Sequence, residues 1–232
     1  MNIDEFKIEV EKLGVDVSLE KLDLLEKYFN LLTEWNKKIN LTAITDKKDV
    51  YLKHFYDSLT ICKVIDLNKE NSFCDIGTGA GFPGIVIKIF FPHLKMTLID
   101  SLNKRINFLG VVCEELNLKD VSLIHGRAEE FARENRDMFD VVTARAVSSF
   151  NVLLEYSIPI VKTNKYFIAM RGNDDSETGV NALKVLNSII LKKECFNLPY
   201  ENSSRCVILV KKMGIVSLKY PRKFSEIKKN SL

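Results

Sequence analysis

An acidic residue followed by alternating glycines, Asp75-Ile76-Gly77-Thr78-Gly79-Ala80-Gly81, is the stretch of this sequence best suited to holding a ligand. It belongs to an apolar segment that predicts a buried strand over 73–76, and a helix start at Pro83 follows. Glycines let the backbone turn sharply and approach a ligand without a Cβ in the way. The start of the helix adds free backbone N–H groups, and proline suits that position because it lacks one. The pattern predicts a loop that binds a nucleotide-like cofactor.

Two kinds of cofactor fit such a loop. A Gly-x-Gly-x-x-Gly match at 79–84 would indicate a dinucleotide site, but Pro83 falls inside the segment that should hold the pyrophosphate. The pattern of an acid followed by glycines at alternate positions, which begins at Asp75 and continues through Gly77 and Gly79, is instead similar to the S-adenosylmethionine loop of Rossmann-like methyltransferases. An NAD(P)-dependent Rossmann oxidoreductase stays open as the alternative, as does a strand–turn–helix without a ligand.

A second acid, Asp100, ends the next predicted strand, roughly 20 residues past the glycine loop. An acid there is placed to accept hydrogen bonds from ribose hydroxyls. Because a helical pattern starts at Lys104, Asp100 could also cap that helix. The two roles are compatible, and the ribose role is favoured.

The periodicity of apolar residues indicates which elements carry these loops. An amphipathic stripe follows a predicted helix cap at Ser18, and a second predicted helix covers 47–65. Residues 1–66 therefore form a predicted helical N-terminal extension. From Ser72 onward, strands alternate with helices, which favours a parallel, doubly wound sheet. The predicted strands are 73–76, 96–99, 122–124, 140–144, 166–170, 190–196 and 206–210. The predicted helices between them are 104–116, 128–133, 151–161 and 178–186.

The last two strands would form an antiparallel hairpin, which methyltransferase folds have and nicotinamide folds usually lack. The predicted fold class is therefore α/β: a Rossmann-like class I methyltransferase sheet, mostly parallel with a terminal antiparallel hairpin, preceded by a helical N-terminal extension. The methyltransferase domain would span 67–218, and a basic C-terminal tail would span 219–232.

Composition limits the remaining possibilities. The chain has 232 residues, of which 46% are hydrophobic, so it can bury a sizeable core. It shows no signal-peptide pattern and no apolar run that could span a membrane, which favours a cytoplasmic protein. The five cysteines lack C-x-x-C spacing, so we expect reduced core residues and neither disulfides nor zinc ligands. The three histidines show no metal-ligand spacing, and no metal is expected.

Charge is concentrated at the C-terminus. The net charge is only +3, but residues 211–232 hold seven basic residues and a single acid, Glu226. The tail is therefore a candidate phosphate-binding arm with Arg222 and Lys223 at its centre. A solvated terminus is the alternative interpretation.

Further polar residues lie at predicted strand ends or beside Trp35. Arg145 and Arg171 each end a strand, where side chains of an open α/β sheet face the ligand crevice. Pairing with a nearby acid is the alternative for both. Next to Trp35 in the sequence lie amide and cationic side chains of the kind that bind sugars and phosphates of RNA, and a histidine follows further along the chain. These RNA-binding candidates are Asn36, Lys37, Asn40 and His54.

Taken together and in order, the segments at 35–42, 54–59, 75–84, 100–105, 126–129 and 140–147 closely resemble the glucose-inhibited division protein B family. This family is also called RsmG, the bacterial guanine-N7 methyltransferases of small-subunit (16S) ribosomal RNA. The resemblance runs from about Leu31 to Gly172. It implies S-adenosylmethionine as methyl donor, and 16S ribosomal RNA or the small ribosomal subunit as partner. The acceptor would be a guanine of the decoding region. A non-catalytic ribosome-assembly factor that retains the fold is a further alternative, and we expect a monomer.

The resemblance also implies roles for individual residues. It places Gly77 and Phe82 at the cofactor, Asp100, Ser101 and Leu102 along its ribose and adenine edge, Ala128 and Glu129 at the adenine, and Arg145 by the reacting end. Two departures stand out. Family tails continue with a Gly-Thr-Pro stretch where this chain has Phe224-Ser225-Glu226-Ile227, and relatives often have Lys at the position of Arg171.

The expected chemistry needs no general base. Guanine N7 carries an in-plane lone pair and no proton, so methyl transfer is a problem of proximity and orientation. Arg145 is therefore the predicted catalytic residue, through an edge-on hydrogen bond to guanine O6.

Overall fold

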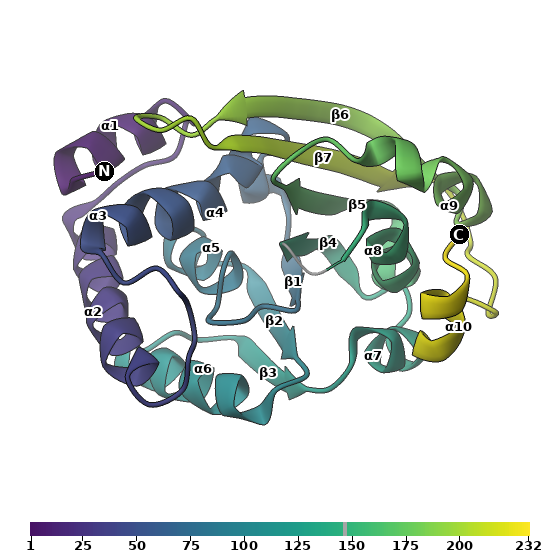
Figure 1. The fold of residues 1–232 in the computed structure, drawn as a ribbon, viewed down its shortest axis with the longest axis horizontal. Helices are drawn as coiled ribbons and strands as arrows, with labels where there is room; N and C mark the ends of the chain where they lie inside the picture. The colour runs from purple at the N-terminus through teal and green to yellow at the C-terminus, as the bar shows by residue number, and fades with distance from the viewer. Residues whose placement is uncertain (146–147) are drawn as a thin grey trace.

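The computed structural model describes residues 1–145 and 148–232, so Ala146 and Val147 of the segment 140–147 lie outside the described residues. In this part of the chain, a seven-stranded sheet has helices on both faces (Figure 1). The strands are β1 (Ser72–Ile76), β2 (Lys95–Asp100), β3 (Val121–His125), β4 (Phe139–Arg145), β5 (Val161–Arg171), β6 (Ser188–Asn197) and β7 (Ser204–Lys212). The helices are α1 (Ile3–Glu11), α2 (Leu19–Asn36), α3 (Lys47–Val50), α4 (Asp57–Leu59), α5 (Gly84–Phe90), α6 (Asn103–Glu115), α7 (Ala128–Glu134), α8 (Phe150–Ser157), α9 (Val180–Val185) and α10 (Phe224–Lys229).

The strand order is β3-β2-β1-β4-β5-β7-β6, and β7 runs antiparallel to both of its neighbours. The chain moves outward from β1 through β2 to β3, then returns to the other side of β1 with β4. The strand order therefore reverses between β1 and β4, and ligands of open α/β sheets bind outside the carboxyl ends of the strands at such a point. The predicted fold class is confirmed, including the terminal hairpin.

The central strands are buried on both faces. Phe73 and Val141 pack into one hydrophobic core, whereas Cys74 and Val142, the next residues along β1 and β4, pack into the other. Continuous apolar runs are typical of parallel strands covered by helices on both sides. The sheet is therefore a rigid platform for the loops at its carboxyl edge.

The helical region packs against the face that carries α5 and α6. Ser18 caps α2, as predicted, and Leu25, Tyr28 and Leu32 form its buried stripe. The hydrophobic core on this side continues from α2 into α5 and the sheet. The division into segments 1–66, 67–218 and 219–232 stays a prediction.

One predicted helix, 47–65, has a different form. It consists of α3, a π-helical segment over Tyr51–Tyr56, α4 and a 3-10 turn over Thr60–Lys63. π-helical turns occur frequently at functional sites, because the wider turn re-aims the side chains that follow. Here it leads directly to Asp57 at the start of α4.

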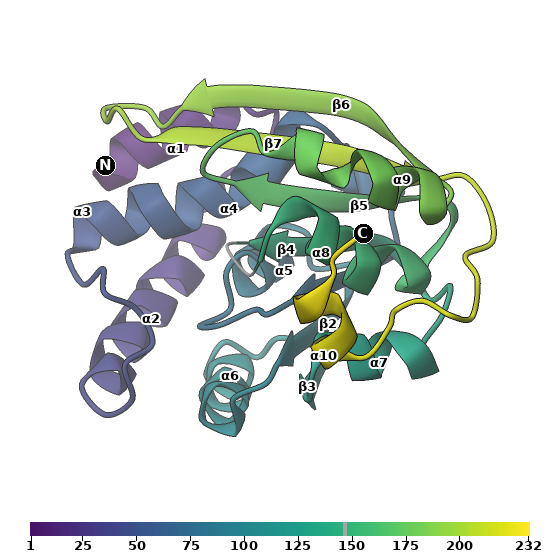
Figure 2. The same ribbon diagram turned by 45° about the vertical axis from the view of Figure 1, so that its right-hand side comes forward.

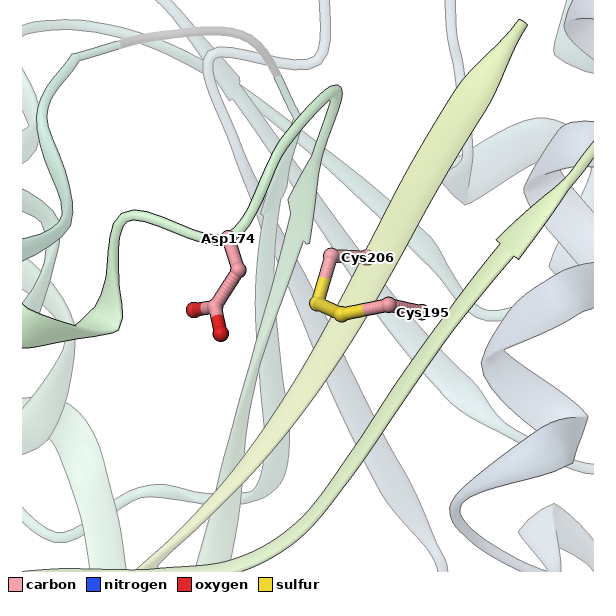
Figure 3. A group of neighbouring side chains, drawn as sticks. All are labelled: Asp174, Cys195 and Cys206. Carbon is pink, nitrogen blue, oxygen red and sulfur yellow. A yellow bond between two sulfur atoms is a disulfide. The ribbon is translucent and has the colours of Figure 1, made fainter. Parts of the chain in front are cut away.

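The prediction that all five cysteines are reduced is wrong for one pair. Cys195 and Cys206 form a disulfide between β6 and β7, because the antiparallel register places them directly opposite each other. Asp174 lies beside this disulfide (Figure 3). The carboxylate and the two sulfur atoms are close enough together to hold a metal ion, but sulfurs joined to each other offer no thiolate ligand. Cys62, Cys74 and Cys113 are free.

The C-terminal tail folds back onto the helices on the other face of the sheet. Figure 2 shows α10 in front of the sheet, near α7 and α8. Arg133 of α7 donates to the Pro221 carbonyl, and Asn151 of α8 donates to the Leu232 carbonyl. Among the described helices, none is long and apolar enough to cross a membrane.

Candidate active site

The glycine loop between β1 and α5 adopts a backbone that side chains rarely allow. Gly77, Gly79 and Gly81 have φ of 67°, 62° and 99°. A Cβ on Gly81 would lie 2.6 Å from the Tyr28 hydroxyl, whereas a Cβ on Gly79 would meet no protein atom closer than 4.0 Å. Gly81 therefore packs the loop against the helices, and Gly79 faces open space.

Two side chains hold the loop in place. The hydroxyl of Tyr28 in α2 donates to the Ala80 carbonyl. Asp75 Oδ2 accepts from the Thr78 hydroxyl at 2.7 Å and from the Gly84 backbone N–H at 2.9 Å. Asp75, predicted as a cofactor ligand, is fully buried beneath the loop and braces its two ends. Its other oxygen, Oδ1, has no hydrogen-bond partner within the described part of the protein.

Asp75 gives the fold a testable dependence on pH. Burial raises the pKa of its carboxyl to about 7, from an ordinary value of 3.8, although hydrogen bonds from Thr78 and Gly84 oppose the shift. Between about pH 4 and pH 7 the folded protein therefore keeps a proton that the unfolded chain releases, so stability falls as pH rises. We expect Asp75→Asn to remove this slope. Its unfolding free energy relative to wild type should rise by at least about 1.4 kcal/mol, one pKa unit, between pH 5 and pH 8. Urea unfolding of both proteins at the two pH values measures this, and parallel curves would contradict it.

Asp100 ties the end of β2 to the glycine loop. Its Oδ2 accepts from the Gly79 N–H at 2.9 Å and from Arg105 Nη1 at 3.2 Å. Its Oδ1 accepts from the backbone N–H of Leu102, the residue that caps α6, at 2.9 Å. The expected capping role is not present, because Leu102 is the N-cap of α6 and, among the described residues, no side chain caps this helix. The Asp100 carboxylate lies in the wall of a cleft. The side chain of Leu102 is exposed and lies outside that wall.

The cleft, which we call the main cleft, has a volume of about 660 Å³ and lies at the carboxyl edge of the sheet. A smaller hollow of about 200 Å³, the side pocket, shares Gly77, Asp100 and Ser101 with it. Predicted site residues that line the main cleft are His54, Gly77, Gly79, Phe82, Asp100, Ser101, Arg145 and Arg171. Ala128 and Glu129 line the side pocket.

Arg145 is held at the carboxyl end of β4 by a buried carboxylate. Its Nη1 donates to Asp57 Oδ2 and to the Lys53 carbonyl, each at 3.1 Å. The second oxygen of Asp57, Oδ1, accepts from Arg205 Nε at 3.0 Å. Asp57 is only 3% exposed and thus fixes two cations that arrive from β4 and β7. Charge-assisted hydrogen bonds of this kind restrict the orientation of a guanidinium strongly.

An aromatic stack supports Arg145 from the side. The imidazole of His54 lies over the ring of Phe82, with centroids 4.4 Å apart and planes 16° from parallel. The Arg145 guanidinium carbon is 5.4 Å from the centroid of the same ring. Burial, and after it the charge of Arg145, lowers the pKa of His54 to about 3. His54 is therefore neutral at neutral pH and a weak proton acceptor. Its Nε2 lies 2.9 Å from the Thr42 hydroxyl, and its Nδ1 lies 3.1 Å from the Lys53 carbonyl and 3.4 Å from Arg145 Nη2.

Comparison with known proteins identifies the family. A family model described as rRNA small subunit methyltransferase G matches residues 21–198. The chain belongs to this family. The Ribosomal RNA small subunit methyltransferase G of Bacillus thuringiensis (strain Al Hakam) is 47% identical over 228 residues, which cover 96% of this chain and 95% of the relative. The predicted family is confirmed, and membership decides against the oxidoreductase alternative.

Solved structures of other proteins share the fold at low sequence identity. Precorrin-6y C5,15-methyltransferase from Geobacter metallireducens GS-15 has a TM-score of 0.53 at 15% identity, covering 68% of this chain and 88% of its own. P. horikoshii TYW2 in complex with MeSAdo also has a TM-score of 0.53, at 13% identity, covering 66% of this chain and 60% of its own. These likenesses agree with a class I methyltransferase sheet.

The predicted RNA-binding residues differ in whether they reach the main cleft. His54 and Arg171 reach the main cleft, although Arg171 is also paired with Asp175, with Nε 2.9 Å from Oδ1. Asn36 instead accepts from the backbone N–H groups of Leu41 and Thr42, and so shapes a loop at the cleft rim. Lys37, Asn40 and Lys223 are exposed away from the cleft lining. Arg222 is bound to the buried carboxylate of Glu155, so its head group is a tail anchor.

The sequence prediction missed two residues of the site, Asp57 and Arg205. Asp57 lies three residues after His54, in the predicted helix 47–65. An acidic residue within this largely apolar segment is the sequence feature that could have indicated a role for it. Arg205 lies at the start of β7, next to Cys206, with no motif around it. Only the antiparallel pairing of β7 with β5 brings it to the carboxyl edge of the parallel strands.

Proposed function

We propose that this chain transfers the methyl group of S-adenosylmethionine to N7 of a guanine in the decoding region of 16S ribosomal RNA, acting as a monomer on the RNA or the small subunit. The observation that carries the proposal is the juxtaposition, in one cleft, of the open glycine loop and the fixed guanidinium of Arg145. When bound, S-adenosylmethionine supplies an electrophilic methyl group on a sulfonium.

The residues present fit this cofactor. The backbone at Gly79 leaves a cradle that a larger side chain would fill. Asp100 lies at the end of β2, where a carboxylate accepts from ribose hydroxyls. Residues proposed to hold the cofactor are Gly77, Gly79, Phe82, Asp100 and Ser101 in the main cleft, with Ala128 and Glu129 around the adenine. Asp75 supports the loop from below.

The same cleft suits a guanine whose N7 must stay free. An arginine fork commonly binds both O6 and N7 of guanine. Asp57 and the Lys53 carbonyl already engage Nη1 of Arg145, and Nη2 lies 3.4 Å from His54 Nδ1, so we place a single Arg145 donor on O6. N7 is then left for the incoming methyl group. Because methylation at N7 makes the ring cationic, an in-plane contact to O6 is also better than stacking of the guanidinium on its face.

A methyl-transfer assay tests the proposal. Labelled S-adenosylmethionine is mixed with 16S ribosomal RNA, or with small subunits, from cells that lack this modification, and nucleosides are analysed by mass spectrometry. We expect 7-methylguanosine at a single position. Cofactor binding without a methylated guanine would indicate a different acceptor or an assembly factor, and absence of binding would contradict the cofactor.

Asp57 should act as a positioning residue for Arg145. We expect Asp57→Asn to lower kcat by about 10- to 100-fold, the cost of one misdirected charge-assisted contact, while the affinity for S-adenosylhomocysteine stays within about two-fold. Asp57→Glu, which keeps the charge, should recover part of the rate. Asp175→Asn, which loosens Arg171 in the same way, is the matched control and should have a smaller effect. Equal losses in the two asparagine variants would contradict a specific role for Asp57.

A further inference from the structure

The C-terminal tail supplies one wall of the side pocket. Much of the remaining lining comes from the ends of β1 and β2 and from residues 126–129 at the start of α7, which include Ala128 and Glu129. The lining also includes Tyr156 of α8 and Phe224, the first residue of α10. An aromatic side chain from the last nine residues of the chain thus borders the hollow proposed for the adenine.

Phe224 is presented as an open aromatic surface. Its side chain is 44% exposed, although it belongs to a helix whose neighbour Ile227 is only 1% exposed. The Arg127 guanidinium carbon lies 5.1 Å from the ring centroid, within the range of a cation–π contact. An exposed phenylalanine fixed beside a small pocket is a surface on which a purine can stack, and such stacking is worth about 1–3 kcal/mol per base.

A buried ion pair fixes the tail in this position. Glu155 in the middle of α8 is fully buried. It accepts from Arg222 three times: from the backbone N–H at 2.9 Å, from Nε at 2.8 Å and from Nη2 at 2.7 Å. Removing one partner of a buried pair is costly because the other charge stays uncompensated. The pair therefore holds the residues just before Phe224 firmly. This segment is anchored to α8 and is not a free RNA-binding arm.

We propose that the tail is part of the cofactor site, with Phe224 packing against the adenine ring and the Arg222–Glu155 pair holding it there. The inference rests on the proposed function, since it assumes an adenosyl cofactor. It assigns Phe224, at the start of α10, to cofactor binding.

Calorimetric titration with S-adenosylhomocysteine tests the inference. We expect Phe224→Ala to weaken binding by about 5- to 100-fold, the range of one lost aromatic–base stack, with an unchanged KM for ribosomal RNA. Phe224→Trp should keep the affinity and, in a Trp35→Phe background that removes the chain's other tryptophan, its fluorescence should change on titration. Leu218→Ala is the matched control, because Leu218 is 86% exposed and lies before the ion pair. Its affinity should match wild type.

The possible results separate the two proposals. If wild type binds S-adenosylhomocysteine and Phe224→Ala binds it equally well, the tail inference is overturned and the cofactor assignment stands. A raised KM for RNA in that variant would make the tail an RNA contact instead. If wild type does not bind at all, the cofactor assignment fails, and the tail inference fails with it.

Discussion

Replacing Arg145 with alanine should lower the rate of methyl transfer by about 100- to 1,000-fold, the loss measured when one oriented donor to a reacting group is removed. The affinity for S-adenosylhomocysteine should stay within a few-fold, because the guanidinium is held by Asp57 and the Lys53 carbonyl on the side of the cleft that we assign to the acceptor. Single-turnover assays with saturating cofactor, together with calorimetry, measure the two quantities.

Arg145→Lys is the informative companion to this variant. Lysine keeps the charge beside Asp57 but is a point donor without the planar fork. If Arg145 serves to orient guanine, the lysine variant should recover little of the rate. Near-normal turnover in Arg145→Ala would contradict a catalytic role for Arg145. A rate restored in Arg145→Lys would show that the positive charge is sufficient and that the planar fork is not needed.

Replacing Gly79 with valine should weaken the binding of S-adenosylhomocysteine by about 100-fold or more. A β-branched residue at φ +62° is strained by about 1–3 kcal/mol. The added side chain would also occupy open space beside the loop, where we place the cofactor. Binding should therefore fail before chemistry does, in contrast to Arg145→Ala. Titration with S-adenosylhomocysteine measures the loss directly.

Gly14 provides a matched control for the strain alone. Its φ is +76° and no atom lies within 4 Å of its Cβ position, but it follows α1, far from the glycine loop in the sequence. Gly14→Val and Gly79→Val should lose comparable thermal stability, whereas only Gly79→Val should lose the cofactor. Normal affinity in Gly79→Val would show that the loop does not approach the ligand at this residue.

The fold could be predicted closely because its signals are local. Strands such as 73–76 and 140–144 are short apolar runs, which the structure extends by a residue or two to Ser72–Ile76 and Phe139–Arg145. The glycine loop and Asp100 could be found for the same reason, since a strand end and a turn determine their positions. The π-helical segment Tyr51–Tyr56 was not foreseen, because its pattern of apolar residues resembles that of an ordinary helix.

The remaining parts of the site depend on pairing between distant segments. Asp57 and Arg205 are 148 residues apart, and only the completed sheet brings them together. The Cys195–Cys206 disulfide likewise follows from the register of β6 with β7, which the spacing of cysteines does not reveal. Arg222 has the charge of an RNA contact, and the buried partner that occupies it, Glu155, lies 67 residues earlier.

Because Arg205 and Phe224 come from the last strand and the tail, the order of synthesis matters for when the site is complete. A growing chain that has emerged only as far as β5 already contains Asp57, Arg145 and the glycine loop, but one oxygen of Asp57 still lacks its second arginine. The side pocket is also still open on the side that Phe224 closes. The ribosome must therefore release β7 before the main cleft has all its walls, and α10 before the side pocket has all of its own.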